Sequence, residues 1–173
     1  MDSLARRNIE IKARCADLAG VRQRMLAIGA AIHESLDQID TYFHTLNNRL
    51  KLRQITGQPA QLIAYTRPNE AAARISDFEL IEITDPDQII RAMSLVLGIR
   101  GRVYKHREVL LWENVRIHLD RVKNLGEFIE FEAIVSENCD QRVCAQRLDH
   151  LMSVAGIATE DLIGESYSDL LKL

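Results

Sequence analysis

The chain lacks the features that would place it in a membrane or outside the cell. No apolar run approaches the roughly 18 residues that a membrane-spanning helix needs, so no such helix is expected. The first residues, through Arg7, lack the apolar segment of a signal peptide. The three cysteines, Cys15, Cys139 and Cys144, form an odd set without a Cys-x-x-Cys pair, which favours reduced cytoplasmic thiols. We therefore expect a soluble cytoplasmic protein without a membrane partner.

The composition also lacks the positive excess of a general nucleic-acid-binding protein. There are 22 Lys and Arg against 25 Asp and Glu, which gives a formal net charge of −3. Any dense group of cations must therefore be gathered at a specific place and balanced by acids elsewhere. The 173 residues contain no linker, repeat or low-complexity segment, and 47% of them are hydrophobic. These values predict one globular domain over residues 1–173.

Three segments carry a polar or charged side chain at every second residue. They are residues 8–14 (Asn-Ile-Glu-Ile-Lys-Ala-Arg), 49–53 (Arg-Leu-Lys-Leu-Arg) and 116–120 (Arg-Ile-His-Leu-Asp). A period of two predicts β-strands with one apolar and one polar face. Neighbouring exposed cations repel one another and weaken a sheet. A strand face this cationic is better explained by an anionic ligand that neutralises it.

Cap and turn signals divide the whole chain into strands and helices. The expected strands are residues 8–15, 32–44, 49–55, 61–67, 75–84, 102–111, 112–122 and 127–135. The expected helices are residues 17–28, 85–97 and 139–155, with short helical turns at 159–163 and 166–171. The apolar stripe between Ile89 and Leu97 is expected to lie in the core. The pattern predicts about eight antiparallel strands, interrupted by helices at three places.

If the sheet closes with its charged faces inward, the chemically active side chains meet in one interior. Its expected cations are Lys12, Arg14, Arg49, Lys51, Arg53, Arg67, Lys105, Arg107 and Arg116. Its expected carboxylates are Glu10, Asp120, Glu130 and Glu132. Carboxylates two residues apart lie about 6.5–7 Å apart on one strand face, and with neighbours they can surround Mg²⁺. The cations suit phosphate oxygens, so the combination indicates metal-assisted triphosphate chemistry.

These motifs resemble the CYTH, or triphosphate tunnel metalloenzyme, superfamily. Its Glu-x-Glu-x-Lys signature appears as residues 8–12, Asn-Ile-Glu-Ile-Lys. Further matches follow in order at residues 37–43, 50–53, 65–68, 105–107, 116–120, 125–132 and 166–171. The resemblance implies an α+β fold, in which an eight-stranded antiparallel β tunnel with a charged interior carries helices outside. Residues 37–43 and 166–171 are most similar to class IV adenylate cyclases.

The resemblance also implies roles for individual residues. The implied ligands of Mg²⁺ or Mn²⁺ are Glu10, Asp120, Glu130 and Glu132. The residues expected to bind the triphosphate are Lys12, Arg14, Lys51, Arg53, Arg67, Lys105, Arg107 and Arg116. Those expected to act in catalysis are Glu10, Lys12, Arg53, Lys105, Arg107 and Arg116. Two departures are that Asn8 replaces the first Glu of the signature, and Thr66 stands where many members have Lys.

More than one activity fits such a site. A class IV adenylate cyclase would convert ATP to cAMP and pyrophosphate, whereas a triphosphatase would release phosphate from inorganic triphosphate or from an organic one such as thiamine triphosphate. The neutral Asn8 also admits a module that binds triphosphate or polyphosphate with little turnover. Nucleic acid is not expected as a partner, because the charges alternate with aliphatic rather than stacking aromatic side chains. His118 is interpreted as a structural histidine ahead of a proton-transfer group, and a homodimer is one candidate assembly.

Overall fold

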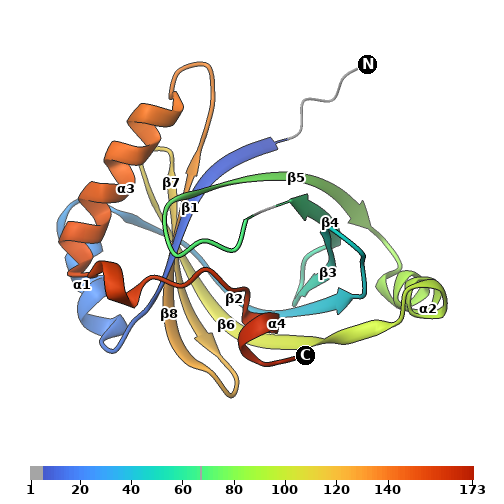
Figure 1. The fold of residues 1–173 in the computed structure, drawn as a ribbon. Coiled ribbons are helices and arrows are strands. Elements are labelled where there is room, and N and C mark those ends of the chain that lie inside the picture. Colours follow the sequence, from blue (N-terminus) through green and yellow to red (C-terminus); the bar gives the residue numbers. More distant parts are fainter. Residues whose placement is uncertain (1–5, 67) are drawn as a thin grey trace.

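The computed structural model describes residues 6–66 and 68–173, and it shows a closed antiparallel barrel (Figure 1). Its strands are β1 (Arg6–Arg14), β2 (Ala31–Phe43), β3 (Arg49–Ile55), β4 (Ala60–Thr66), β5 (Arg74–Ile83), β6 (Ile99–Trp112), β7 (Val115–Val122) and β8 (Gly126–Ile134). The order around the barrel is β1-β5-β4-β3-β2-β6-β7-β8. The predicted fold, an eight-stranded antiparallel tunnel with outer helices, is confirmed.

Both faces of β1 are buried, for different reasons. Its odd residues, such as Ile9 and Ile11, are 6% and 3% exposed and belong to a large apolar cluster. Its even residues, such as Glu10 and Lys12, are 6% and 5% exposed and face the barrel interior. The period of two thus separates an outer apolar face from an inner charged face within the same strand.

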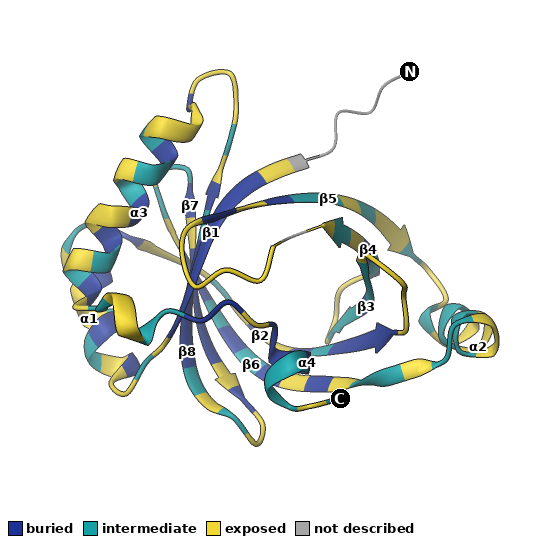
Figure 2. Ribbon diagram, viewed as in Figure 1, coloured by how far each residue is buried: buried dark blue, intermediate teal, exposed yellow. Residues whose placement is uncertain are grey.

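The main apolar core lies between the barrel and two helices. Helices α1 (Leu18–Ala27) and α3 (Gln141–Ala155) lie side by side against β1, β7 and β8 (Figure 1). Phe131 and Leu148 are both fully buried in this layer, and Figure 2 shows the buried residues continuing along the strands beneath the helices. The expectation that a charged interior forces the hydrophobic core to the outside of the barrel is confirmed.

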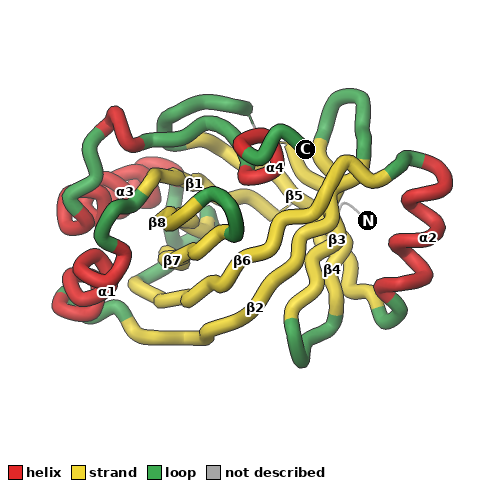
Figure 3. The backbone as a smooth tube through the Cα atoms, turned by 90° about the horizontal axis from the view of Figure 1, so that it is seen from below, coloured by secondary structure: helices red, strands yellow, loops and turns green. Residues whose placement is uncertain are grey.

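Helix α2 (Pro86–Val96) corresponds to the helix expected over residues 85–97, has Asp85 as its N-cap and lies at the opposite end of the molecule from α1 and α3 (Figure 3). Its inner side chains pack on a small cluster around Phe43 and Leu52. The prediction that its whole apolar stripe lies in the core is wrong, because Val96 is 79% exposed and no residue of α2 is fully buried. A single helix on a strand face buries only the side chains that touch the strands.

The chain ends in a short 3₁₀ helix, η1 (Thr159–Asp161), and in α4 (Tyr167–Leu170). The segment between them crosses β1, where Ile163 N donates to Lys12 O over 2.8 Å. Figure 3 shows α4 lying between the two ends of the molecule that α2 and the α1–α3 pair occupy. Among residues 6–66 and 68–173, no helix combines the length and apolar character needed to cross a membrane.

The position of the core predicts where truncation destabilises the protein. Phe131→Ala removes a fully buried ring from the layer beneath α1 and α3, and should lower the free energy of unfolding by about 3–5 kcal/mol. Leu95→Ala is the control, because Leu95 is 87% exposed and its loss should cost less than about 0.5 kcal/mol. Urea denaturation followed by circular dichroism measures both values. Equal effects would contradict an outer core.

Candidate functional site

The barrel interior holds a cavity of about 360 Å³ to which all eight strands contribute inward-facing side chains. Such a volume lies within the range of small-molecule pockets. The predicted site residues that line it are Glu10, Lys12, Lys51, Arg53, Lys105, Arg107, Arg116, Glu130 and Glu132. The inward face of the strands thus brings most of the predicted site residues to one place.

Three described residues that were expected in the interior are not among the lining residues, namely Asp120, Arg14 and Arg49. Arg49 instead donates to Asp169 Oδ2 over 2.9 Å. Asp120 lies behind the wall and is fully buried. Arg14, the last residue of β1, is exposed, and its guanidinium carbon lies 5.3 Å from the centre of the Phe128 ring. Arg67 lies outside the described residues. The alternation of polar and apolar residues predicts which face of a strand a residue occupies. It does not predict how far along the barrel, or how deep in its wall, that residue lies.

A buried carboxylate, Asp40, holds part of the cationic wall in position. Lys51 Nζ lies 3.0 Å from Asp40 Oδ2, and Arg53 Nε donates to Oδ1 over 3.1 Å. Burial would raise the pKa of Asp40, but the positive charges of Lys51, Arg53 and Lys105 outweigh it and hold that pKa well below its usual range. Asp40 was not selected from the sequence, because only the register of β2 and β3 places it opposite Arg53.

Two lysines of this wall titrate near neutral pH. Burial and the neighbouring Arg53 lower the pKa of Lys51 to about 7, although Asp40 opposes the shift. Burial and the adjacent Arg107 lower the pKa of Lys105 to about 8 in the same way. The positive charge of the cavity therefore depends on its occupant, because an anion that enters favours the protonated form of both lysines.

A second buried carboxylate, Asp120, orients Arg107. The Nε and Nη2 atoms of Arg107 donate to its two oxygens over 2.6 Å each, and Tyr167 Oη donates to Oδ2 over 2.8 Å. Burial would raise the pKa of Asp120, but Arg107 and Lys105 outweigh it, so the carboxylate stays charged. Both oxygens of Asp120 are thus engaged by neighbouring side chains, and Asp120 anchors the wall from behind the cavity surface. Its role as a metal ligand stays a prediction.

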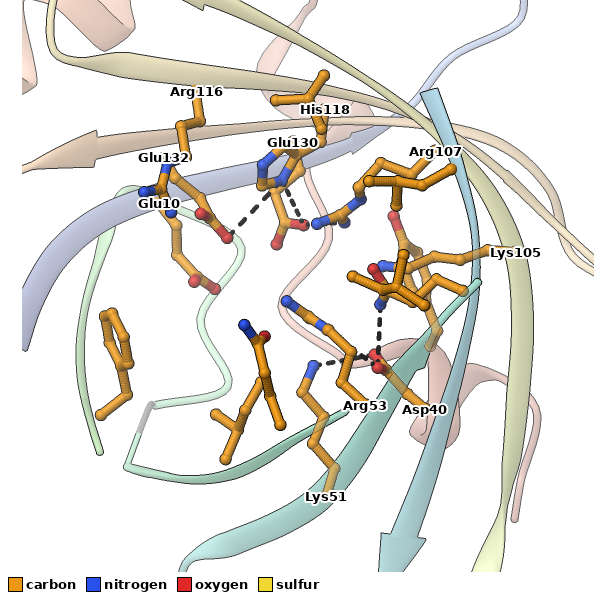
Figure 4. Close-up of a pocket in the computed structure, with 18 of the residues that line it drawn as sticks. Glu10, Asp40, Lys51, Arg53, Lys105, Arg107, Arg116, His118, Glu130 and Glu132 are labelled. Atoms are coloured by element: carbon orange, nitrogen blue, oxygen red, sulfur yellow. Dashed lines mark hydrogen bonds and ion pairs between the residues drawn. The ribbon is translucent and has the colours of Figure 1, made fainter. Parts of the chain in front are cut away.

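Across the cavity, β7 and β8 present His118, Glu130 and Glu132 (Figure 4). His118 Nδ1 lies 3.6 Å from Glu130 Oε2 and 3.7 Å from Glu132 Oε1. Glu130 also accepts a hydrogen bond of 2.9 Å from Arg107 and lies 3.4 Å from Lys12 Nζ. Burial would raise the pKa of Glu130, but Lys12, His118 and Arg107 together hold it well below its usual range. Glu130 is therefore an ionised group between the two walls.

This cluster fits a divalent cation. One ligand atom from each of the three side chains lies within 4.8 Å of the others. Nδ1 of His118 is buried and has no hydrogen-bond partner among the described residues. Since nearly all buried polar atoms have such a partner, this nitrogen is available to bind a ligand. Glu10, the third predicted ligand on the cavity surface beside Glu130 and Glu132, lies opposite Glu132 in the β1–β8 register, and its Oε1 accepts from Arg74 over 3.1 Å.

The C-terminal segment supplies lining residues to which sequence analysis assigned no role. Tyr167 lies in α4, and its ring centre is 4.3 Å from Lys12 Nζ and 5.1 Å from Lys105 Nζ. Burial and the neighbouring Asp120 raise the pKa of Tyr167 well above its usual range, so its hydroxyl remains a donor. The tail motif at residues 166–171 was the available signal, but nothing local to it indicates which strands it covers.

Comparison with known proteins agrees with this geometry. A family model described as CYTH domain matches residues 6–167. A Methanocaldococcus jannaschii protein named "Putative adenylate cyclase" is 22% identical in an alignment 172 residues long, which covers 94% of this chain and 97% of that protein.

Solved structures share the fold. A Pyrococcus horikoshii protein has a TM-score of 0.84 at 21% identity, with 94% of this chain and 98% of that one covered. A Hippeastrum protein, described as a "putative adenylyl cyclase" with a dominant triphosphatase activity, has a TM-score of 0.64 at 16% identity, with 96% of this chain and 95% of that one covered. At these identities the likeness is one of fold. The family match over nearly the whole chain shows that this protein belongs to the CYTH domain family.

Proposed function

We propose that this protein is a divalent-metal-dependent enzyme that acts on a triphosphate, with conversion of ATP to cAMP and pyrophosphate as the leading reaction. One observation carries the proposal: cations and an imidazole–carboxylate cluster line facing and adjoining parts of the same cavity (Figure 4). The cations on the cavity surface are Lys12, Lys51, Arg53, Lys105, Arg107 and Arg116. A polyanion that carries a metal ion complements both walls at once.

The cationic wall is organised before a ligand enters. Asp40 positions Arg53, and Asp120 positions Arg107, so that these guanidinium groups need little rearrangement to meet phosphate oxygens. Lys105 and Arg107 are only 7% and 4% exposed, and burial strengthens their electrostatic interactions. A divalent metal, when bound, supplies Lewis-acid activation of the attacking oxygen. The arginines stabilise the negative charge that develops on the leaving phosphate oxygens.

The apolar part of the lining supports an organic triphosphate. It comprises Leu36, Ile55, Ile63, Phe78 and Leu80. Inorganic triphosphate has no group that gains from contact with such side chains, whereas the base and ribose of ATP do. In the cyclase reaction, the ribose 3′-oxygen forms a bond to the α-phosphorus, loses its proton and displaces pyrophosphate. The name of the Methanocaldococcus jannaschii relative supports the same assignment.

A triphosphatase is the second candidate. The Hippeastrum protein, which has the same fold, is described as having a dominant triphosphatase activity although it was named for the cyclase reaction. In this reaction a water oxygen forms the new bond to the terminal phosphorus, and the remaining diphosphate leaves. Both reactions place charge on oxygens that the same arginines contact, so the products distinguish them.

Product analysis tests the two reactions directly. We expect the purified protein to form cAMP and pyrophosphate from ATP with Mg²⁺ or Mn²⁺. Release of phosphate, with ATP, inorganic triphosphate or thiamine triphosphate as the substrate, would establish the triphosphatase instead. Tight binding of all three substrates without any product would contradict an enzyme and favour a binding module.

The role of the cluster is tested by Glu130→Gln, which removes a charge with little change in volume. Loss of a metal-binding carboxylate should lower metal-dependent turnover by at least about 100-fold, because such an interaction is worth several kcal/mol. Glu79→Gln, on an exposed position of β5, is the matched control and should keep wild-type activity. Wild-type activity in Glu130→Gln, with an unchanged melting temperature in both variants, would rule out the assignment.

The lowered pKa of Lys51 predicts how binding depends on pH. Above about pH 7 the free lysine is neutral, and triphosphate binding must then recruit a proton. Without metal, the affinity of the wild type for inorganic triphosphate should fall by about fivefold between about pH 7 and pH 8, relative to Lys51→Arg, whose guanidinium does not titrate. The comparison cancels the ionisation of the ligand itself. Parallel pH profiles, measured by titration calorimetry, would show that Lys51 does not titrate in this range.

A further inference from the structure

We propose that Nδ1 of His118 is a metal ligand together with Glu130 and Glu132, and that this mixed set selects a first-row transition-metal ion over Mg²⁺. The inference rests on the proposed function for its location, since the same cavity receives the triphosphate. The family resemblance implies a ligand set of carboxylates alone, whereas this cluster contains an imidazole.

The first observation is an unsatisfied buried nitrogen. The His118 side chain is 6% exposed, and Nδ1 makes no hydrogen bond in the part of the chain that the structure describes. A buried polar atom left without a partner costs about 1–3 kcal/mol, so nearly all such atoms have one. The two carboxylate oxygens at 3.6 and 3.7 Å are too far away for hydrogen bonds. An electron-pair acceptor at this point would give Nδ1 a partner, in addition to the partners that Glu130 already has in Lys12 and Arg107.

The second observation is the spacing of the donors. Metal bonds to imidazole nitrogen and carboxylate oxygen are about 2.0–2.2 Å long, so two donors on one tetrahedral ion lie about 3.4 Å apart. Nδ1 of His118 lies 3.6 Å from Glu130 Oε2 and 3.7 Å from Glu132 Oε1, and one ligand atom of each of the three side chains lies within 4.8 Å of the others. This spacing is close to that of a metal site and longer than that of a hydrogen-bonded cluster.

The sheet holds the three donors in place. His118 lies directly opposite Glu130 in the β7–β8 register, and Glu132 follows two residues later on the same face of β8. All three side chains line the barrel cavity, and Figure 4 shows them converging there. Donors on paired strands vary less in position than donors on loops, which favours a site formed before the metal binds.

The local charge balance determines which metal the site prefers. Glu130 already shares its charge with Lys12 and Arg107, at 3.4 and 2.9 Å. Asp120 is engaged by Arg107, and Asn8 brings a neutral amide to the position that carries a Glu in the family signature. Mg²⁺ depends on oxygen ligands and gives up its water reluctantly, so this set offers it little. Imidazole is a ligand that suits Mn²⁺, Co²⁺ and Zn²⁺ better than Mg²⁺, so its presence favours these ions over Mg²⁺ at this site.

Metal binding to the full-length, tag-free protein, stripped with chelator and measured without triphosphate, tests the inference. We expect the wild type to bind Co²⁺ at least about tenfold more tightly than Mg²⁺ in titration calorimetry. His118→Asn substitutes an amide for the imidazole and should remove most of that advantage while it changes the Mg²⁺ affinity less than about threefold. His106→Asn, on the outer face of β6 beside Asp37, is the matched control and should alter neither affinity.

Pulsed electron paramagnetic resonance of the wild-type Mn²⁺ complex gives a second readout that requires no variant. A ¹⁴N coupling from a coordinated imidazole is the expected result. Absence of this coupling, or wild-type Co²⁺ affinity in a folded His118→Asn, would overturn the inference.

These outcomes are separable from those of the proposed function. Turnover of a triphosphate without imidazole coordination would leave the function standing and reject the metal assignment. Imidazole coordination in a protein that turns over no triphosphate would support the metal assignment and reject the function.

Discussion

The interior of this barrel depends on the neutralisation of cations by buried carboxylates. Lysines and arginines enclosed together repel one another and lose their hydration, and both effects oppose folding. Asp40 joins Lys51 to Arg53, and Asp120 takes both donor nitrogens of the Arg107 fork. These anchors leave the cationic wall ordered but incompletely neutralised, as the lowered pKa values of the two lysines indicate. The remaining positive potential is what an anionic substrate can use.

A charged interior changes where the protein obtains its stability. In most small barrels the apolar side chains meet inside, whereas here Ile9, Ile117 and Phe131 point outward and pack beneath α1 and α3. Each strand in this region is buried on both faces, so it is constrained by helix packing on one side and by ion pairs on the other. The carboxylate side of the site is therefore built on strands packed on both faces, while α2 covers a smaller cluster and keeps an exposed outer side.

Much of the candidate site could be predicted because strand periodicity assigns residues to a face. Arg53, Arg107 and Glu130 all line the cavity as the alternation requires. The role of each residue on that face was harder to predict from the sequence, since it depends on which side chains meet across neighbouring strands. His118 was interpreted as structural, yet it lies between two carboxylates with an unsatisfied nitrogen. Asp40 was overlooked, because a single acid in β2 carries no sign of the lysine and arginine that surround it.

The sequence by itself determined the strands, the helix caps, the charged inner face and the family. The tertiary structure alone decided how deep each inward residue lies and which group it meets. His118 and Asp120 are two residues apart on the same face of β7, but the first borders the cavity and the second is enclosed by Arg107 and Tyr167. Alternation is a local property of the backbone, whereas these partners come from β6 and from a tail far along the chain. Their meeting depends on the closure of the barrel and on the path of the C-terminal segment.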